Sequence, residues 1–230
     1  MATTSSSGLV KNTDFSAELL LNKIMNNEYR ANSGKTLTIG GRMNAAKLDA
    51  DAQLFGIDAE NVAKNVAIAD ATQDALEEIL SLAQKAQSAA KLTDTAAQVA
   101  LGTEYKNQLA ELLKATVNGV SILNTTQTAG LGLGAGQITL GLEMSANDGY
   151  KALTSALSAI SAGTGSSAVS VLESAVNQLI STVAVHGSKA ALLSNRYDAL
   201  NDMATAYKDA SDAQAVNTGG NATSLLNSLL

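Results

Sequence analysis

Apolar or small side chains recur at alternating steps of four and three residues between positions 172 and 207, with one histidine among them and no break in the spacing. This spacing is typical of a helix that packs lengthwise on another helix, with a repeat near 3.5 residues. A helix over residues 168–213 would be about 70 Å long at about 1.5 Å per residue, so it needs partner helices along its length. The predicted seam residues are Leu172, Val176, Leu179, Val183, His186, Ala190, Leu193, Tyr197, Leu200, Ala204 and Tyr207.

The same alternation runs from residue 62 to residue 90, with two glutamines as the only polar intrusions. It predicts a second packed helix. A third helix is predicted from about Ala96 to Thr116, and Gly119 follows where a left-handed residue often ends a helix. We expect these helices to bundle and to bury their seams against one another. The seam residues of the second helix are Val62, Val66, Ala69, Leu76, Leu80 and Ala83.

The composition suits long helices and excludes several classes of function. The 230 residues include no proline, the strongest helix breaker, and no cysteine, so disulfides, thiolate nucleophiles and cysteine-based zinc sites are excluded. A net charge of −6 argues against a nucleic acid partner. No uninterrupted apolar run reaches the length that spans a bilayer, and the N-terminus shows no signal-peptide pattern. We therefore expect no membrane insertion and no cleaved signal peptide.

Outside these helices the chain changes character. Residues 121–150 are rich in glycine and threonine and predict a small β-hairpin with Ile138, Leu140 and Leu142 on one face. Residues 151–162 predict a short helix, and the three glycines between Ser33 and Gly41 predict a break with some extended backbone. The predicted fold class is mainly α: an elongated antiparallel helical bundle or coiled-coil rod with a small β-hairpin region.

Four features could carry chemistry, and each has a structural interpretation. His186, the only histidine, lies on a seam beside neither a serine–acid pair nor further metal ligands. Asp49 and Asp51 would point about 200° apart on a helix, and near a helix start they would favour its dipole. The stretches NSGKTL (32–37) and GLGLGAG (130–136) are incomplete nucleotide-binding patterns. We therefore predict no enzyme activity, no cofactor and no metal site.

Several motifs occur in a fixed order along residues 14–214. GGRMNAAKLDADA, QDALEEI, EYKNQLAELLK and NGVSIL occupy the N-terminal half; ITLGLEMSANDG and HGSKAALLSNRYDAL follow. This ordered set resembles the bacterial flagellin family, whose members carry S-G-x-R-I-N, E-G-A-L-x-E-I, N-G-x-x-L-L, G-A-N-D-G and Q-N-R-F patterns in corresponding places. The resemblance implies a secreted structural subunit that self-assembles into a flagellar or flagellin-like filament at the cell surface, for motility or for adhesion.

The resemblance also implies a domain organisation and partners. Residues 1–40 would form an N-terminal filament-core segment and 41–120 the N-terminal part of a helical rod. Residues 121–167 would be a short outer region with a hairpin, 168–213 the long rod helix, and 214–230 a shortened C-terminal core segment. The partners implied are copies of the same chain, the type III flagellar export machinery and an export chaperone.

The terminal segments cannot bury their apolar residues alone, so we expect them to become ordered only against neighbouring copies. The candidate assembly residues are Phe15, Leu19, Leu20, Ile24, Arg42, Asn44, Leu225, Leu226 and Leu229. The chain departs from the family in having only a short segment after Arg196, and residues 76–85 place glutamates and leucines where an innate immune receptor contacts arginines. Two alternatives stay open: a hook–filament junction protein, and a soluble helical adhesion or export-tip protein.

Overall fold

The computed structural model of the protein describes residues 39–132 and 135–229, with side chains placed for 45–132 and 135–215. The chain divides into two compact units. The first unit comprises Met1–Asn61 and Arg196–Leu230, and the second comprises Val62–Asn195. The described part is mainly helical and includes two small antiparallel strand pairs, which confirms the predicted class at that level.

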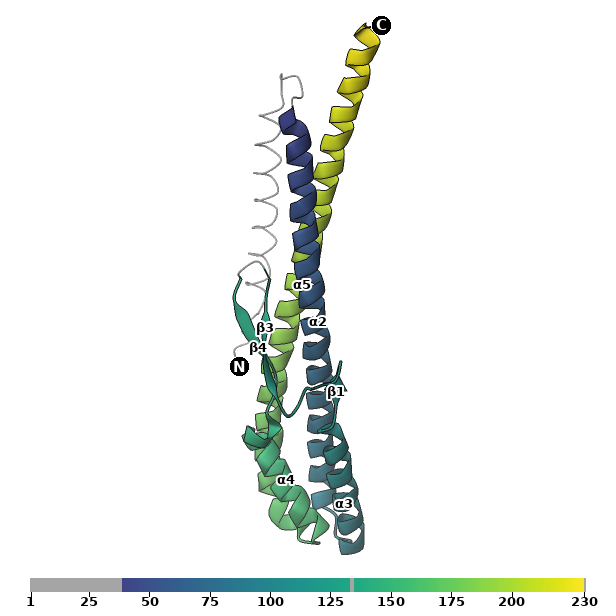
Figure 1. Cartoon of the computed structure of the whole chain (residues 1–230). Helices are drawn as coiled ribbons and strands as arrows, with labels where there is room; N and C mark the ends of the chain where they lie inside the picture. Colours follow the sequence, from purple (N-terminus) through teal and green to yellow (C-terminus); the bar gives the residue numbers. More distant parts are fainter. Residues whose placement is uncertain (1–38, 133–134, 230) are drawn as a thin grey trace, which may run out of the picture. The chain divides into compact units, whose positions relative to one another are not determined.

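The elements follow one another along the chain as labelled in Figure 1. The helices are α2 (Ile39–Ala90), α3 (Thr95–Leu112), α4 (Asp148–Ser161) and α5 (Val169–Leu229), with two short 3-10 turns, η2 (Met144–Ala146) and η3 (Gly165–Ala168). The strands are β1 (Thr116–Val117), β2 (Val120–Ser121), β3 (Thr126–Gly130) and β4 (Gln137–Gly141).

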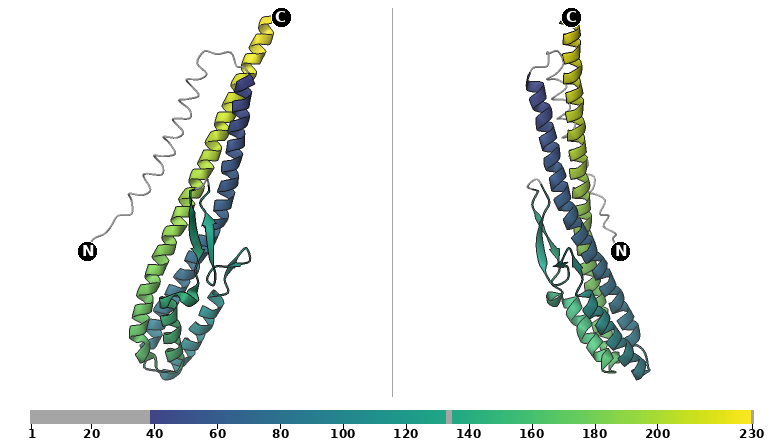
Figure 2. Two further views of the ribbon diagram at one scale, coloured as in Figure 1. Left: turned by 60° about the vertical axis from the view of Figure 1, so that its left-hand side comes forward. Right: turned by 45° about the vertical axis from the view of Figure 1, so that its right-hand side comes forward.

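In the second unit, α2 and α5 run antiparallel and side by side (Figures 1 and 2). Gly165, just before α5, lies against the backbone of Ala90 at the end of α2, whereas Gly187 lies against the side chain of Gln73. The order of these contacts is reversed between the two helices, as antiparallel packing requires. Alanine is frequent in both helices and proline is absent, so propensity and packing favour the same structure.

Helices α3 and α4 complete the second unit and pack closely on each other. Asp94 caps α3 by accepting hydrogen bonds from the amides of Ala96 and Ala97, at 2.9 and 3.2 Å. Gly102 of α3 faces the end of α4 so closely that an added Cβ would lie 2.5 Å from the backbone nitrogen of Ser161. The α3–α4 crossing therefore depends on the absence of a side chain at residue 102.

Helix α4 is in turn held on α5 through its N-cap. Asn147 accepts a hydrogen bond from the amide of Tyr150 at 3.0 Å, and its side-chain amide donates to the hydroxyl of Thr182 at 3.1 Å. Gly149 lies against Gln178 and Leu179 of α5. The same residue, Asn147, therefore begins α4 and attaches it to the long helix.

The strands form two hairpins. β1 pairs with β2 through a two-residue turn in which Asn118 and Gly119 have φ angles of 52° and 79°. Two residues with positive φ match a type I′ turn, which is the usual turn of a tight hairpin. The prediction that Gly119 ends a helix is therefore wrong: α3 ends at Leu112, and the glycine serves the hairpin.

The second hairpin pairs β3 with β4 in antiparallel order. Thr126 lies opposite Gly141 at one end of the pair, and Gly130 lies opposite Gln137 at the other. It confirms the hairpin predicted in residues 121–150. Leu140 is buried, and Ile138 and Leu142 are half-buried. The amide side chain of Asn65 on α2 donates a hydrogen bond to the carbonyl of Gly130 at 3.4 Å, which joins this hairpin to α2.

Two predicted helix boundaries are wrong. α2 begins at Ile39, inside the predicted break, and α5 continues to Leu229, beyond the predicted end near residue 213. The four-three spacing of buried positions continues in α5 up to and beyond the predicted end, but some of the side chains there are polar, so a pattern of apolar residues does not reveal it. Its buried positions after Leu200 include Ser211 and Gln214, which keep the spacing although they are polar.

Candidate functional site

The seam between α2 and α5 is the feature on which the predicted function depends. Among the predicted seam positions of the second unit, every second one, seven residues from the next, has a buried side chain. The seam positions between them are half-buried, except Ala190, which is also buried. The buried predicted residues are Val62, Ala69, Leu76, Ala83, Leu172, Leu179, His186 and Leu193. The half-buried ones are Val66, Leu80, Val176 and Val183. In the first unit the same spacing continues on α5 at Tyr197, half-buried, and Leu200, buried.

The first unit joins α2 to α5 by a set of specific contacts. Lys208 donates to Asp49 at 2.8 Å, and the hydroxyl of Ser211 donates to the carbonyl of Ala45 at 2.9 Å. The rings of Phe55 and Tyr207 lie 4.9 Å apart between centroids, in a tilted arrangement that favours aromatic pairs. Chain order is reversed here too, because residue 45 meets residue 211 and residue 49 meets residue 208.

These contacts give Asp49 a structural explanation. The hydrogen bond from Lys208 and its positive charge hold the pKa of Asp49 below its ordinary value, and the same pairing raises the pKa of Lys208. The prediction that Asp49 and Asp51 lie near a helix start is wrong, since α2 begins ten residues earlier at Ile39. Asp49 accepts from its partner helix, and the side-chain amide of Gln53 also donates to it at 3.0 Å.

A second buried stripe on α2 was missed by the sequence analysis. Its residues also follow four-three spacing, and each lies one position before a residue of the predicted seam. In the second unit α2 is therefore buried on two adjacent faces. The signal was present in the sequence, but its alanines and threonine are weak markers of a core. The stripe consists of Ile68, Thr72, Ala75, Ile79, Leu82, Ala86 and Ala89.

Gln98 is the other residue that sequence reasoning missed, and it joins three segments. Its side chain is buried and donates to the carbonyls of Ala90 and Leu92, at 3.2 and 2.5 Å. Its carbonyl oxygen accepts from the amide of Gly165 at 3.3 Å. One side chain therefore ties the end of α2, the start of α3 and the turn before α5 together, and it satisfies backbone groups that are otherwise costly to bury.

His186 is buried in the seam with an exposed fraction of 5%. Burial, reinforced by the positive charge of Lys189, lowers the pKa of His186 to about 4. The neutral imidazole is therefore the form that the native seam contains near neutral pH. Among the described residues, no cluster of three or more histidine, cysteine, aspartate or glutamate side chains is arranged to bind a metal ion.

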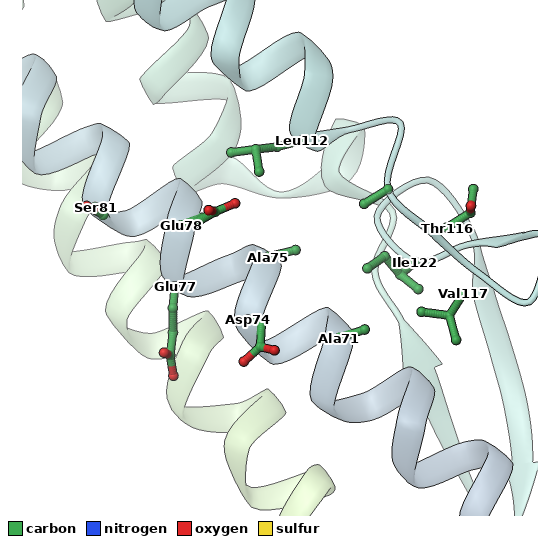
Figure 3. Close-up of a pocket in the computed structure, with 11 residues that line it drawn as sticks. Ala71, Asp74, Ala75, Glu77, Glu78, Ser81, Leu112, Thr116, Val117 and Ile122 are labelled. Carbon is green, nitrogen blue, oxygen red and sulfur yellow. The ribbon is translucent and has the colours of Figure 1, made fainter.

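A surface groove of about 570 Å³ lies between α2, the end of α3 and the first hairpin (Figure 3). Leu112, Val117 and Ile122 give it an apolar side. Figure 3 shows Glu78 on the side of α2 that faces Leu112, whereas Asp74 and Glu77 project away from the hairpin. The carboxylates are exposed, and one of them, Glu77, accepts a hydrogen bond from Gln73 at 2.7 Å. The groove combines negative charge with apolar surface, and nothing in it resembles a nucleophile and base in contact.

The predicted assembly residues lie where side chains are not described. Phe15, Leu19, Leu20 and Ile24 fall outside the described residues. The remaining five lie on helices whose backbone alone is described at those positions: Arg42 and Asn44 on α2, and Leu225, Leu226 and Leu229 on α5. Their proposed role therefore stays a prediction.

Among the described residues, one helical stretch, Gly165–Ala215, is long and apolar enough on average to cross a membrane. Core helices of proteins that never enter a membrane meet the same criterion, so the expected lack of membrane insertion stays a prediction. No model of a known protein family matches the chain. No characterised protein matches it in sequence either.

Proposed function

We propose that this protein is a flagellin-like structural subunit that assembles with copies of itself into an extracellular filament. The observation that carries the proposal is the antiparallel pairing of α2 and α5, which brings the motif-bearing N-terminal and C-terminal parts of the chain together in both units. Asp49 and Lys208 are paired in the first unit, and Gln73 and Gly187 are in contact in the second. The ordered motifs that resemble flagellins lie on these helices and on the segments between them.

The energetics of the seam favour a preformed rod element. Each Leu or Val buried there contributes about 1.5–3 kcal/mol, and the alanines allow the two helices to approach closely. We propose that α2 and α5 pack as a coiled-coil rod that persists in a single copy. The outer hairpins then take the place of the large variable domains that many flagellins carry.

The proposed assembly uses the terminal segments as the adhesive parts. The apolar stripe of residues 14–31 and the leucine-rich end LLNSLL would pack against neighbouring copies. A head-to-tail contact that does not close generates a helical polymer. Within this proposal the chain is exported through the type III flagellar channel, with an export chaperone as a transient partner.

A pair of deletions tests the proposal. Removing residues 1–32 should abolish filaments in negative-stain electron microscopy and leave the helical circular dichroism of the rod nearly unchanged. The control removes residues 131–136, the tip of the second hairpin, and should leave filaments intact. Filaments that persist without residues 1–32 would refute the assembly mechanism. Short closed rings from the intact chain would favour a hook–filament junction protein, and a persistent monomer would favour a soluble adhesion or export-tip protein.

A further inference from the structure

The fully exposed positions of α5 between residues 174 and 195 carry no charged side chain, and Lys189, the single charged residue of this stretch, is half-buried. Its exposed positions are small or neutral polar residues and three large apolar ones: Ile180, Val185 and Leu192, with exposed fractions of 47%, 56% and 44%. Val185 and Leu192 are seven residues apart and lie on one side of the helix, whereas Ile180 lies on another side. Exposed helix faces normally carry charges, and α2 in the same unit carries several exposed carboxylates. In the most apolar part of the same helix, only 22% of residues are buried. This face therefore has the character of an interface.

A second exposed apolar pair lies on α2 in the first unit. Leu54 and Ile57 are 59% and 55% exposed and stand three residues apart, so they are neighbours on one side of the helix. The surrounding stretch, residues 45–61, contains one lysine and four acidic residues. Residues 174–195 of α5 contain a single charged side chain, Lys189. Both stretches therefore present exposed apolar side chains, and the stretch on α2 is net negative whereas the single charge of the stretch on α5 is positive.

We propose that the Val185–Leu192 face of α5 in one copy packs against the Leu54–Ile57 face of α2 in a second copy. The inference rests on the proposed self-assembly and names the surfaces that carry it. Small side chains at Ala184, Ser188 and Ala191 let a neighbouring helix approach closely. When two copies join through two different surfaces, the pair still has one free α5 face and one free α2 face. Further copies can therefore be added. Pairing of two α5 faces would instead close as a dimer and bring Lys189 near its own copy.

The absence of native cysteine makes cross-linking a direct test. Leu54→Cys and Val185→Cys are prepared as separate proteins, assembled as a mixture and mildly oxidised. The mixture should give about tenfold more disulfide-linked dimer than either protein alone, because assembly raises the effective concentration of the two thiols. The control mixture pairs Leu54→Cys with Asn107→Cys, an exposed site on α3, and should give no such increase.

A second measurement keeps the inference testable without cysteines. Val185→Ser should reduce the pelletable polymer several-fold, whereas Val99→Ser, which changes a valine of 37% exposure on α3, should not. Circular dichroism of both variants should match the parent, since neither site is buried. Filaments that form normally from the Leu54→Cys and Val185→Cys mixture without a disulfide between the two proteins would overturn this inference and leave the proposed function standing. The absence of any polymer from the intact chain would remove the proposed function as well.

The test also separates a protein partner from a lipid surface. Dimers linked through Val185→Cys alone would show pairing of two α5 faces and overturn the inference. Flotation of the intact protein with phosphatidylcholine vesicles, together with protection of Val185→Cys from a water-soluble thiol reagent, would show that the face binds membranes and would overturn it too. We expect no flotation and full reagent access in the monomer.

Discussion

At the scale of single residues, Gly102 shows how closely two helices approach. A Cβ at this position would lie 2.9 Å from the carbonyl carbon of Ile160 as well as 2.5 Å from the nitrogen of Ser161. Both neighbours are backbone atoms, so they cannot move aside without displacing α4. Gly56 on α2 differs, because an added Cβ there meets nothing within 4 Å.

We therefore predict opposite effects from the same substitution at the two glycines. Gly102→Ala should lower the free energy of unfolding by about 1–3 kcal/mol through overpacking. Gly56→Ala should raise it by about 0.5–1 kcal/mol, because alanine is the better helix former and no contact opposes it. Urea denaturation of both variants measures these changes. Equal effects at the two sites would contradict the α3–α4 crossing.

His186 provides a prediction for pH dependence. Its pKa is about 4 in the native protein and 6.5 in its ordinary state, so the unfolded chain binds the proton first as pH falls. Stability contributed by the neutral imidazole is complete above about pH 6.5 and is lost as pH falls towards 4. The loss should reach about 2–3 kcal/mol at pH 4.5. The lowered pKa of Asp49 acts only at still lower pH, below its ordinary value of 3.8.

Urea denaturation at pH 7 and pH 4.5 tests this assignment in the parent and in His186→Gln. The variant cannot take up the proton and should lose less stability between the two pH values. A fall of the same size in parent and variant would place the titrating group elsewhere.

At the scale of elements, the end of the second unit depends on Gln98. Gln98→Ala removes three hydrogen bonds and leaves buried backbone groups of Ala90 and Gly165 without that partner. We predict a loss of about 2–4 kcal/mol, since each buried group left without a partner costs about 1–3 kcal/mol. Gln108→Ala, on the same helix, removes only an exposed contact to Glu104 and should cost less than about 0.5 kcal/mol.

Hydrogen exchange locates the effect of the Gln98 change. The amide of Gly165 donates to Gln98 and should exchange faster in Gln98→Ala, whereas amides in the first unit should be unaffected. Unchanged exchange at Gly165 would show that the three segments are held together by other contacts.

The sequence predicts elements well where spacing alone decides them. The seam at Leu172, Leu179 and Leu193 follows from the four-three alternation, because a helix that packs lengthwise on another buries the side chains that recur at this spacing. The hairpin at residues 126–141 follows from alternation and glycines. The prediction fails at Gly119, whose left-handed conformation fits both a helix end and a hairpin turn, and the preceding Asn118, also at positive φ, is the local sign of the hairpin.

Polar members of buried networks were also beyond prediction. Gln98 looks like any exposed helical glutamine in sequence, and its role arises only when residues 90, 92 and 165 meet. Thr72 is fully buried, and its hydroxyl donates to the carbonyl of Ile68 at 2.7 Å, a partner within its own helix. A polar residue that satisfies itself locally gives no sign of burial in the sequence.

At the scale of the whole molecule, the two units share one structural principle. In each, α2 and α5 are antiparallel and are joined by seam contacts, with Phe55 and Tyr207 in the first and Gln73 and Gly187 in the second. Exposed apolar residues lie on these same two helices at positions that the seams do not use. The proposed self-assembly accounts for both sets, since the first set holds α2 against α5 and the second would join copies.

The concentration dependence of sedimentation tests the central claim most directly. Velocity sedimentation of the intact chain is recorded over a series of increasing concentrations. The proposed function predicts species that grow continuously beyond the 23.4 kDa single chain and beyond any small closed oligomer. A single species of 23.4 kDa at every concentration would contradict the proposal that this protein is built to assemble with copies of itself.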